Sequence, residues 1–145
     1  MATTTASLSI TSSDLFDDSL SISTSNALNK AGLTEGLDQT TGLNKVYLTA
    51  TTNVDIVTVP GATKDGKQNF VYIGNLSEIA SEYLVVSIGD KVIGRLYAGD
   101  FMWMPWNQQA VHLSDIEIAP SVATGMWVEH MIIGEGLVMT SSADS

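Results

Sequence analysis

The chain has 145 residues, of which 44% are hydrophobic, and this is enough for one domain with its own core. Sixteen acidic and six basic residues give a net charge of −10, so nucleic acid and anionic membranes would repel it. The absence of cysteine excludes disulfides, thiolate catalysis and cysteine-ligated metals. The negative charge either keeps a β-rich protein soluble or complements a basic partner surface.

The N-terminus and the apolar runs predict a soluble protein that is made in a cytoplasm. Residues 1–5 lack the basic and apolar regions of a signal peptide. No apolar run approaches the eighteen residues that a membrane span needs.

Residues 1–44 form a Ser/Thr-rich arm and linker that differ from the rest of the chain. Ser-Leu-Ser-Ile occurs twice, at residues 7–10 and 19–22, and alternates apolar with hydroxyl residues as a half-buried strand does. We expect a hairpin or two edge strands. The candidate interface residues here are Leu8, Ile10, Leu20 and Ile22. An isolated strand pair is marginal, so this arm must dock on its own domain or on a neighbouring subunit.

Two segments connect this repeat to the rest of the chain. Residues 26–32 could form one helical turn or be extended. Residues 33–44 are the candidate linker, because the three Gly-Leu steps at this part of the chain favour a loop.

From Lys45 onward, short apolar segments alternate with turn signals, which is typical of an antiparallel β-sandwich or jelly roll. The expected strands span residues 46–50, 54–59, 69–74, 83–88, 91–97, 101–104, 111–118, 126–133 and, as a short edge strand, 137–139. Gly89-Asp90 joins two of them into a hairpin. Residues 75–82 are expected to form a loop with one turn. The β-sandwich core is thus expected over residues 45–140, with a flexible tail at 141–145.

Nothing in the sequence is placed like a reactive centre. His112 and His130 have no second histidine two or four residues away, and Glu129 and His130 point to opposite faces of one strand. The chain has no Gly-x-Ser-x-Gly, Gly-x-Gly-x-x-Gly or phosphate-loop motif. A cupin enzyme would need two or three converging histidines and a glutamate. We therefore expect no enzymatic activity, no catalytic residue, no metal and no cofactor.

Residues 101–106 form an aromatic segment, Phe-Met-Trp-Met-Pro-Trp. In a strand, Phe101 and Trp103 share one face and the two methionines share the other, so both faces are apolar. Either the strand is buried on both sides, or one face lies in the core and the other in a subunit contact. Trp103 and Trp106 are candidate interface residues, and Trp106 is the better placed because it follows the strand end. An exposed Trp would also suit a carbohydrate platform.

Four segments of the chain carry a family resemblance. They are EYLVVSI at residues 82–88, GRLYAGDFMWMPW at 94–106, IAPSVAT at 118–124 and VEHMII at 128–133. This pattern resembles small structural proteins of tailed bacteriophages, notably marine and cyanobacterial ones. In that group a Gly-Arg-Leu, Gly-Asp, aromatic, Pro segment precedes a closing strand with a Glu-[Tyr/His]-Met step. The Ser-Leu-Ser-Ile and Ala-Gly-Leu-Thr-x-Gly-Leu segments also fit, so the resemblance covers nearly the whole chain.

The resemblance implies a virion component with a jelly-roll-like fold, a capsid decoration or cement protein, and no catalytic residue. We expect it on the capsid surface, bound to junctions of the major capsid protein lattice, self-associated as a homotrimer. Many weak contacts made at once would give avidity. The alternative is a tail- or fibre-associated domain that binds a host receptor glycan, and a further option is a tail or adaptor component.

Overall fold

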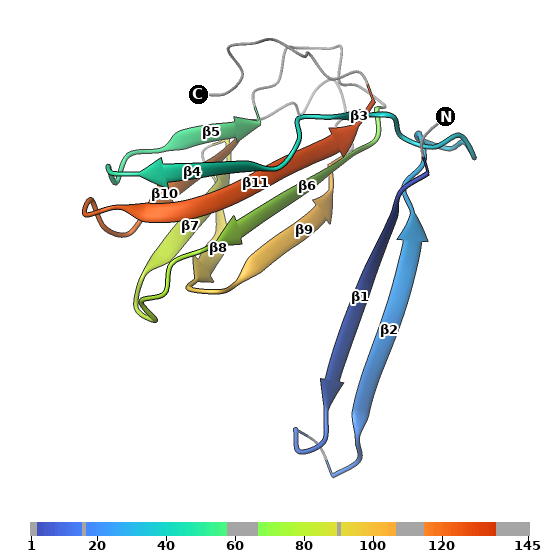
Figure 1. Ribbon diagram of the computed structural model, residues 1–145, viewed down its shortest axis with the longest axis horizontal. Helices are drawn as coiled ribbons and strands as arrows, with labels where there is room; N and C mark the ends of the chain where they lie inside the picture. The colour runs from blue at the N-terminus through green and yellow to red at the C-terminus, as the bar shows by residue number, and fades with distance from the viewer. Residues whose placement is uncertain (1–2, 16, 58–66, 90, 107–114, 136–145) are drawn as a thin grey trace.

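The computed structural model describes residues 3–15, 17–57, 67–89, 91–106 and 115–135 (Figure 1). Within these ranges the chain forms β-strands and no α-helix, and every strand pair in its sheets is antiparallel. The prediction of an all-β, antiparallel protein is therefore confirmed. The strands are β1 (Thr5–Ser12), β2 (Leu20–Ala27), β3 (Gln39–Thr40), β4 (Asn44–Leu48), β5 (Val54–Val57), β6 (Asn69–Asn75), β7 (Tyr83–Ile88), β8 (Lys91–Tyr97), β9 (Phe101–Pro105), β10 (Ile116–Pro120) and β11 (Met126–Gly134).

The strands from β4 to β11 pair in a nested order. β4 pairs with β11, β5 with β10, β6 with β9 and β7 with β8, so the second half of this region retraces the first. Two further pairs, β6 with β11 and β7 with β10, join these strand pairs into two sheets. The first sheet has the order β4-β11-β6-β9, with β3 also beside β11, and the second has the order β5-β10-β7-β8. In Figure 1, β7 and β8 pass behind the first sheet.

The main core takes its side chains from both sheets. Inward residues alternate with outward ones along the strands, as the period of a strand requires. The buried members are Leu48, Val71, Ile73, Leu84, Val86, Ile116, Ile118, Met126, Val128 and Ile132. Full burial of such an aliphatic side chain contributes about 1.5–3 kcal/mol, so this cluster is the main source of stability.

A second, smaller core joins the arm to the body. Leu28 and Leu37 are each only 1% exposed, and they form a cluster with Phe70, against which Trp103 also packs. The Leu37 N–H donates to the Leu28 carbonyl at 2.9 Å, so the chain between the two leucines closes into a loop. We call Leu28 and Leu37 the plug. The segment at 33–44, expected to be a plain linker, therefore contributes Leu37 to this core and also contains strand β3.

The N-terminal repeat forms a hairpin, which was one of the two expected arrangements. β1 and β2 pair along their whole length, with Ile10 opposite Ile22, and form a two-stranded sheet of their own. Figure 1 shows this hairpin, called the arm below, projecting away from the body. Residues 26 and 27 continue β2, so the extended alternative for the start of segment 26–32 is correct and the helical turn is wrong there.

The expected body strands are confirmed where the structure describes them, with small shifts of their ends. The strand expected at 46–50 is β4, which starts and ends two residues earlier, and β9 continues through Pro105. The hairpin of β7 and β8 is confirmed, with a register shift between Val86 and Ser87. Residues 76–82 form a loop with a turn closed by the Glu82 N–H on the Ile79 carbonyl, as expected. The edge strand expected at 137–139, the tail at 141–145 and parts of strands 54–59 and 111–118 lie outside the described residues.

Candidate interaction surfaces

The arm has one apolar face and one hydroxyl face. The strand register places Leu8, Ile10, Leu20 and Ile22 on the same side of the hairpin. Leu8 is 42% exposed, and Ile10 and Ile22 are each 44% exposed. The opposite side carries cross-strand hydroxyl pairs, such as Ser9 with Ser23. The structure thus brings the four arm residues predicted from the sequence together on one uncovered surface, called the apolar face of the arm below.

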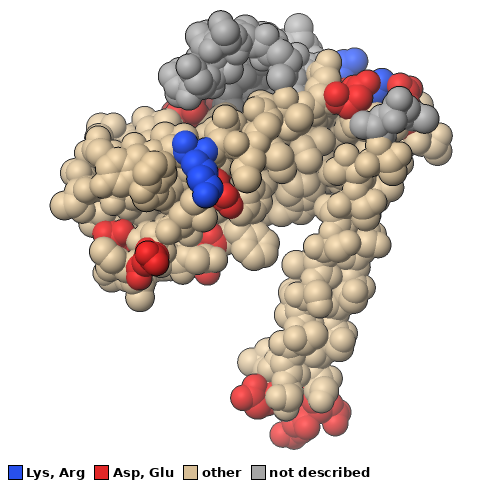
Figure 2. Space-filling model, in the orientation of Figure 1, with Lys and Arg blue, Asp and Glu red and all other residues tan. Residues whose placement is uncertain are grey.

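The tip of the arm is acidic. Asp14, Asp17 and Asp18 lie in the connection between β1 and β2, and residues 3–27 contain no Lys or Arg. Figure 2 shows acidic groups gathered at the far end of the arm. The turn is closed by the Ser12 hydroxyl, which accepts a hydrogen bond from the Leu15 N–H at 3.1 Å. The arm therefore carries an uncovered apolar face along its length and negative charge at its end.

The base of the arm is fixed on the body by several contacts. The Leu28 N–H donates to the Thr4 carbonyl at 2.8 Å, and Ala6 packs against the cluster of Leu28, Leu37 and Phe70. Because Ala6 lies on the same side of β1 as Leu8, the apolar face of the arm is turned toward the body at its base.

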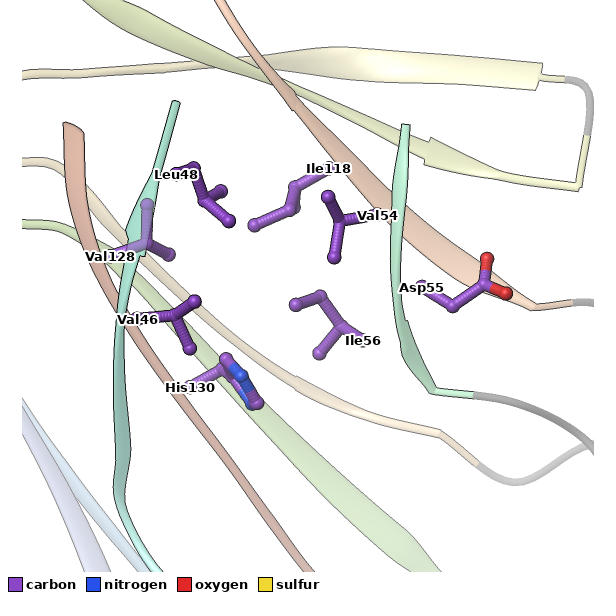
Figure 3. A pocket seen from close by; sticks show the side chains of 8 residues that line it. All are labelled: Val46, Leu48, Val54, Asp55, Ile56, Ile118, Val128 and His130. Carbon is purple, nitrogen blue, oxygen red and sulfur yellow. The ribbon is translucent and has the colours of Figure 1, made fainter. Parts of the chain in front are cut away.

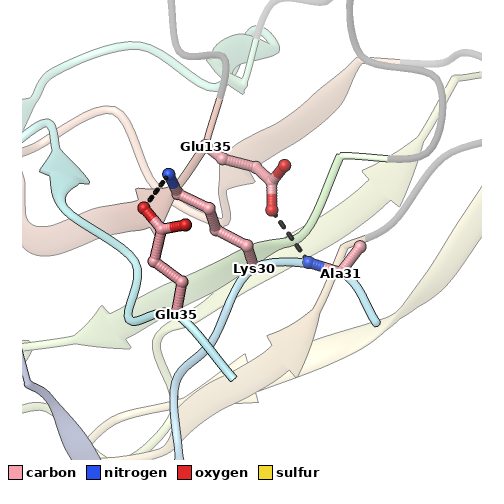
Figure 4. A network of polar contacts seen from close by, with 4 residues as sticks. All are labelled: Lys30, Ala31, Glu35 and Glu135. Carbon is pink, nitrogen blue, oxygen red and sulfur yellow. Dashed lines mark hydrogen bonds and ion pairs between the residues drawn. The ribbon is translucent and has the colours of Figure 1, made fainter. Parts of the chain in front are cut away.

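Polar contacts hold the loop that contains the plug. The Ala31 N–H donates to Glu135 Oε2 at 2.9 Å, and Lys30 Nζ lies 2.7 Å from Glu35 Oε2 (Figure 4). The hydrogen bond from Lys30 lowers the pKa of the Glu35 carboxyl, and the same bond raises the pKa of Lys30. Both groups of this ion pair are exposed, so the plug and the Glu135 contact hold the arm more firmly than the ion pair does.

The outer face of the first sheet is rich in aromatic rings. Tyr47 is 49% exposed, Trp127 is 50% exposed and Phe101 is 58% exposed. The Tyr47 and Trp127 ring centroids are 5.0 Å apart, and those of Tyr72 and Phe101 are 6.4 Å apart. We call these four residues the aromatic face. Exposed apolar patches of this kind mark interaction sites on soluble proteins.

Polar groups fix the rings of the aromatic face. Tyr72 Oη donates to Glu129 Oε1 at 2.9 Å, and burial together with this bond raises the pKa of Tyr72. Tyr47 Oη donates to the Thr124 carbonyl at 3.2 Å. Gly125, at a φ of +119°, leaves space for that ring, because a Cβ there would lie 1.9 Å from the Tyr47 hydroxyl. The two tyrosine rings of the aromatic face are therefore held in place by hydrogen bonds.

The aromatic segment uses its two sides differently. The two methionines of β9 pack against the main core, whereas Trp103 stacks on Phe70 with 5.3 Å between centroids and an interplanar angle of 11°. The predicted sharing of faces along β9 is thus confirmed. The chain's own plug covers Trp103, while Phe101 on the same side stays exposed.

Trp106 is half-buried and packs against the main core, so the structure does not bring it next to Trp103's cluster. The Nε1 atom of Trp106 and the Oδ1 atom of the adjoining Asn69 are both buried, and neither has a hydrogen-bond partner among the described residues. The prediction that Trp106 lies at a subunit contact stays a prediction.

His130 faces a small cavity between the sheets. The cavity has a volume of about 20 Å³ and is lined mainly by aliphatic side chains of β4, β5, β10 and β11 (Figure 3). Its volume is enough for about one water molecule and far too small for an organic ligand. In Figure 3 the Asp55 carboxylate points away from the cavity.

Burial lowers the pKa of His130, so the imidazole is neutral at pH 7. Glu129 bonds Tyr72 on the other face, which confirms that the two residues diverge.

Other candidate chemistry gives no site in the part of the chain that the structure describes. His112 falls outside that part. Among the described residues, no group of three or more His, Asp or Glu is placed to hold a metal ion. No helix within the same ranges is long and apolar enough to cross a membrane.

The aromatic face was not predicted from the sequence. Each ring lies at an outward position of its own strand, and the alternation of inward and outward residues along that strand is visible in the sequence. However, Tyr47 and Trp127 become neighbours only through the register of β4 on β11, which links residues eighty positions apart. Comparison with known proteins finds no matching family model, no similar curated protein and no similar solved structure.

Proposed function

We propose that this chain is a decoration or cement protein of a tailed-phage capsid, which binds the major capsid protein lattice and stabilises the head. The observation that carries the proposal is the arm, a hairpin anchored at its base whose apolar face is uncovered along its length. Such a hairpin is marginal alone and is stabilised when a neighbouring protein covers it. The resemblance of the sequence to phage virion proteins supports the same role.

We propose further that the body is a jelly-roll sandwich. The nested pairing of β4 to β11 is the order expected when a long antiparallel ribbon of eight strands rolls up into two sheets. Side chains from both sheets share one buried cluster, as in a sandwich. A rigid body of this kind suits a non-enzymatic protein that presents surfaces to its neighbours.

The test is binding to empty capsids of a tailed phage that encodes the chain. Wild-type protein is expected to cosediment with capsids and to occupy repeated lattice positions in a cryo-EM map. It should also raise the temperature at which the capsids disrupt. Density only at the tail or its fibres, or no binding to capsids, would refute the decoration role.

A second candidate function rests on the aromatic face. The exposed Tyr47 and Trp127 rings, with the Glu129 carboxylate on the same face of the sheet, could stack on a sugar, as in a host-receptor-binding domain of a tail or fibre. A glycan array measures this directly. Wild-type binding that is lost in Trp127→Ala would support the receptor role in place of the decoration role.

A further inference from the structure

Two apolar surfaces of this chain lack a cover among the described residues. One is the apolar face of the arm, with Leu8, Ile10 and Ile22, and the other is the aromatic face, with Tyr47, Phe101 and Trp127. Both are present once in every copy. A contact between the arm of one copy and the aromatic face of another would therefore cover both surfaces of every chain, because each copy supplies one of each.

The arm cannot cover the aromatic face of its own chain. Its base is held by the Leu28 and Leu37 plug, by the Leu28–Thr4 hydrogen bond and by the contact of Ala6. Figure 2 shows the rest of the arm separated from the body by an open gap. Among the described residues of the chain, nothing therefore covers the aromatic face.

The two surfaces match in size and chemistry. Eight-residue strands are about 26 Å long at about 3.3 Å per residue, and the strands β4, β11, β6 and β9 span about 14 Å at about 4.8 Å spacing. A hairpin of two strands fits on such a face as one sheet packs on another. Leucine and isoleucine side chains on one side would meet flat aromatic rings on the other, a favourable combination.

Charge contributes little to this match. The arm carries three aspartates at its tip and no basic residue. On the outer side of the first sheet, Lys45 is exposed in the row next to Tyr47, while Glu129 in that row is hydrogen-bonded to Tyr72. Lys45 lies directly opposite Glu129 in the strand register, so these two charges offset each other and the match rests on the apolar side chains.

We propose that the arm of one copy packs its apolar face on the aromatic face of a second copy. Such a contact uses different surfaces on the two partners, so repeated copies join head to tail, and we expect the rotation between copies to close them into a ring rather than an open filament. The inference deepens the proposed decoration role and rests on it only for the ring size, which is expected to be three.

The first experiment measures self-association of the full chain by sedimentation equilibrium. The arm variant is Ile10→Thr with Ile22→Thr, which keeps β-branched side chains, and the face variant is Trp127→Thr. Each is expected to raise the dissociation constant at least about tenfold. The matched controls are Ser9→Thr with Ser23→Thr, on the hydroxyl face of the arm, and Val92→Thr, exposed on the second sheet. Both controls are expected to associate like wild type.

The second experiment mixes the two deficient variants. The arm variant keeps an intact aromatic face and the face variant keeps an intact arm, so one productive contact remains for each pair. The mixture is expected to form a one-to-one heterodimer, while each variant alone is monomeric. Thermal melting verifies that each variant is folded, and Tyr47→Thr replaces Trp127→Thr if the latter is not.

Several results would overturn the inference. They are a monomeric wild type, an oligomer that both variants leave intact, and a mixture that stays monomeric. Loss of glycan binding in Trp127→Thr with an unchanged oligomer would make the aromatic face a carbohydrate site instead. Capsid binding is scored separately: a monomer that decorates capsids refutes arm exchange alone, and a ring that ignores capsids refutes the decoration role alone.

Discussion

The side-chain amide of Asn75 donates a 2.9 Å hydrogen bond to the backbone carbonyl of Leu96, and this bond connects the two sheets. Asn75 ends β6 in the first sheet, and Leu96 lies in β8 of the second. Asn75 is only 1% exposed, and its Oδ1 accepts a bond from the Ser77 N–H at 2.9 Å. Its backbone N–H donates to the Asp100 carbonyl and its own carbonyl accepts from Gly99 N–H, both at 3.0 Å. Asn75 thus provides hydrogen-bond partners for the backbone at the corner where the chain passes from β8 to β9.

Replacing Asn75 with Ala is expected to lower the free energy of unfolding by about 2–3 kcal/mol. The substitution removes three side-chain hydrogen bonds, to Leu96, Glu82 and Ser77, and leaves the partly buried Leu96 carbonyl without that donor. Urea denaturation followed by circular dichroism measures the change. The matched control is Asn53→Ala, whose exposed amide makes a long 3.4 Å bond to Glu117 and should change stability by less than about 0.5 kcal/mol. Equal midpoints for Asn75→Ala and wild type would contradict this role.

Local patterns predicted most of the body. Alternation along residues 126–133 already separated Glu129 from His130, and the structure places them on opposite sides of β11. The same reasoning separated the methionines of residues 101–104 from Trp103. These predictions hold because the side-chain period of a strand depends only on neighbouring residues.

Long-range relations could not be predicted in this way. Leu28 and Leu37 stand in a glycine-rich stretch without periodicity, so nothing local marks them as core residues. Asn75 looks like any loop-forming residue until β8 lies beside it. The aromatic face needs the register of β4 on β11 and of β9 on β6, which the sequence of one chain does not specify.

Truncation separates the arm from its anchor. Removal of residues 1–26 is expected to leave a folded body that no longer attaches to capsids or to other copies, because it deletes the projecting hairpin and the contacts of Thr4 and Ala6 but keeps Leu28, Leu37 and β3. Removal of residues 1–44 also deletes Leu28, Leu37 and β3, and it uncovers Phe70. Each lost buried leucine costs about 1.5–3 kcal/mol, so the longer truncation should unfold at lower urea concentration.

Urea melts and capsid cosedimentation of both truncated proteins test this prediction. The sequence alone predicts that a soluble β-domain survives removal of residues 1–44, and the urea midpoint shows whether it does. A protein without residues 1–26 that still decorated capsids at full occupancy would rule out attachment through the arm.

His130 is expected to make stability fall in mildly acidic solution. Burial lowers its pKa in the folded chain below the value of about 6.5 that it has when unfolded. The unfolded chain therefore binds the proton more readily, so this contribution to stability is complete above about pH 6.5 and decreases as pH falls below it. Urea midpoints measured between about pH 7.5 and pH 5.5 should show the decrease.

His130→Leu supplies the control, because it keeps an apolar side chain at the cavity and removes the titrating group. Its midpoint should vary less over the same pH range, while His112 and all carboxylates remain. At pH 7.5, His130→Ala is expected to cost under about 1.5 kcal/mol, as an ordinary substitution does. Identical pH dependence in wild type and His130→Leu would remove His130 as the cause.

Trp106 can act in the core, in a subunit contact or in both, and one substitution separates these roles. Because the ring packs against the main core, Trp106→Ala is expected to lower the free energy of unfolding by about 2–3 kcal/mol. If Trp106 also lies at a subunit contact, as the sequence predicts, self-association should weaken by about 2–4 kcal/mol. Urea denaturation measures the first effect and sedimentation equilibrium the second. Trp127→Thr is the matched comparison, since that half-exposed ring should change association with little effect on unfolding. A Trp106→Ala protein that associates like wild type would exclude Trp106 from the contact, and one that also unfolds like wild type would exclude it from the core.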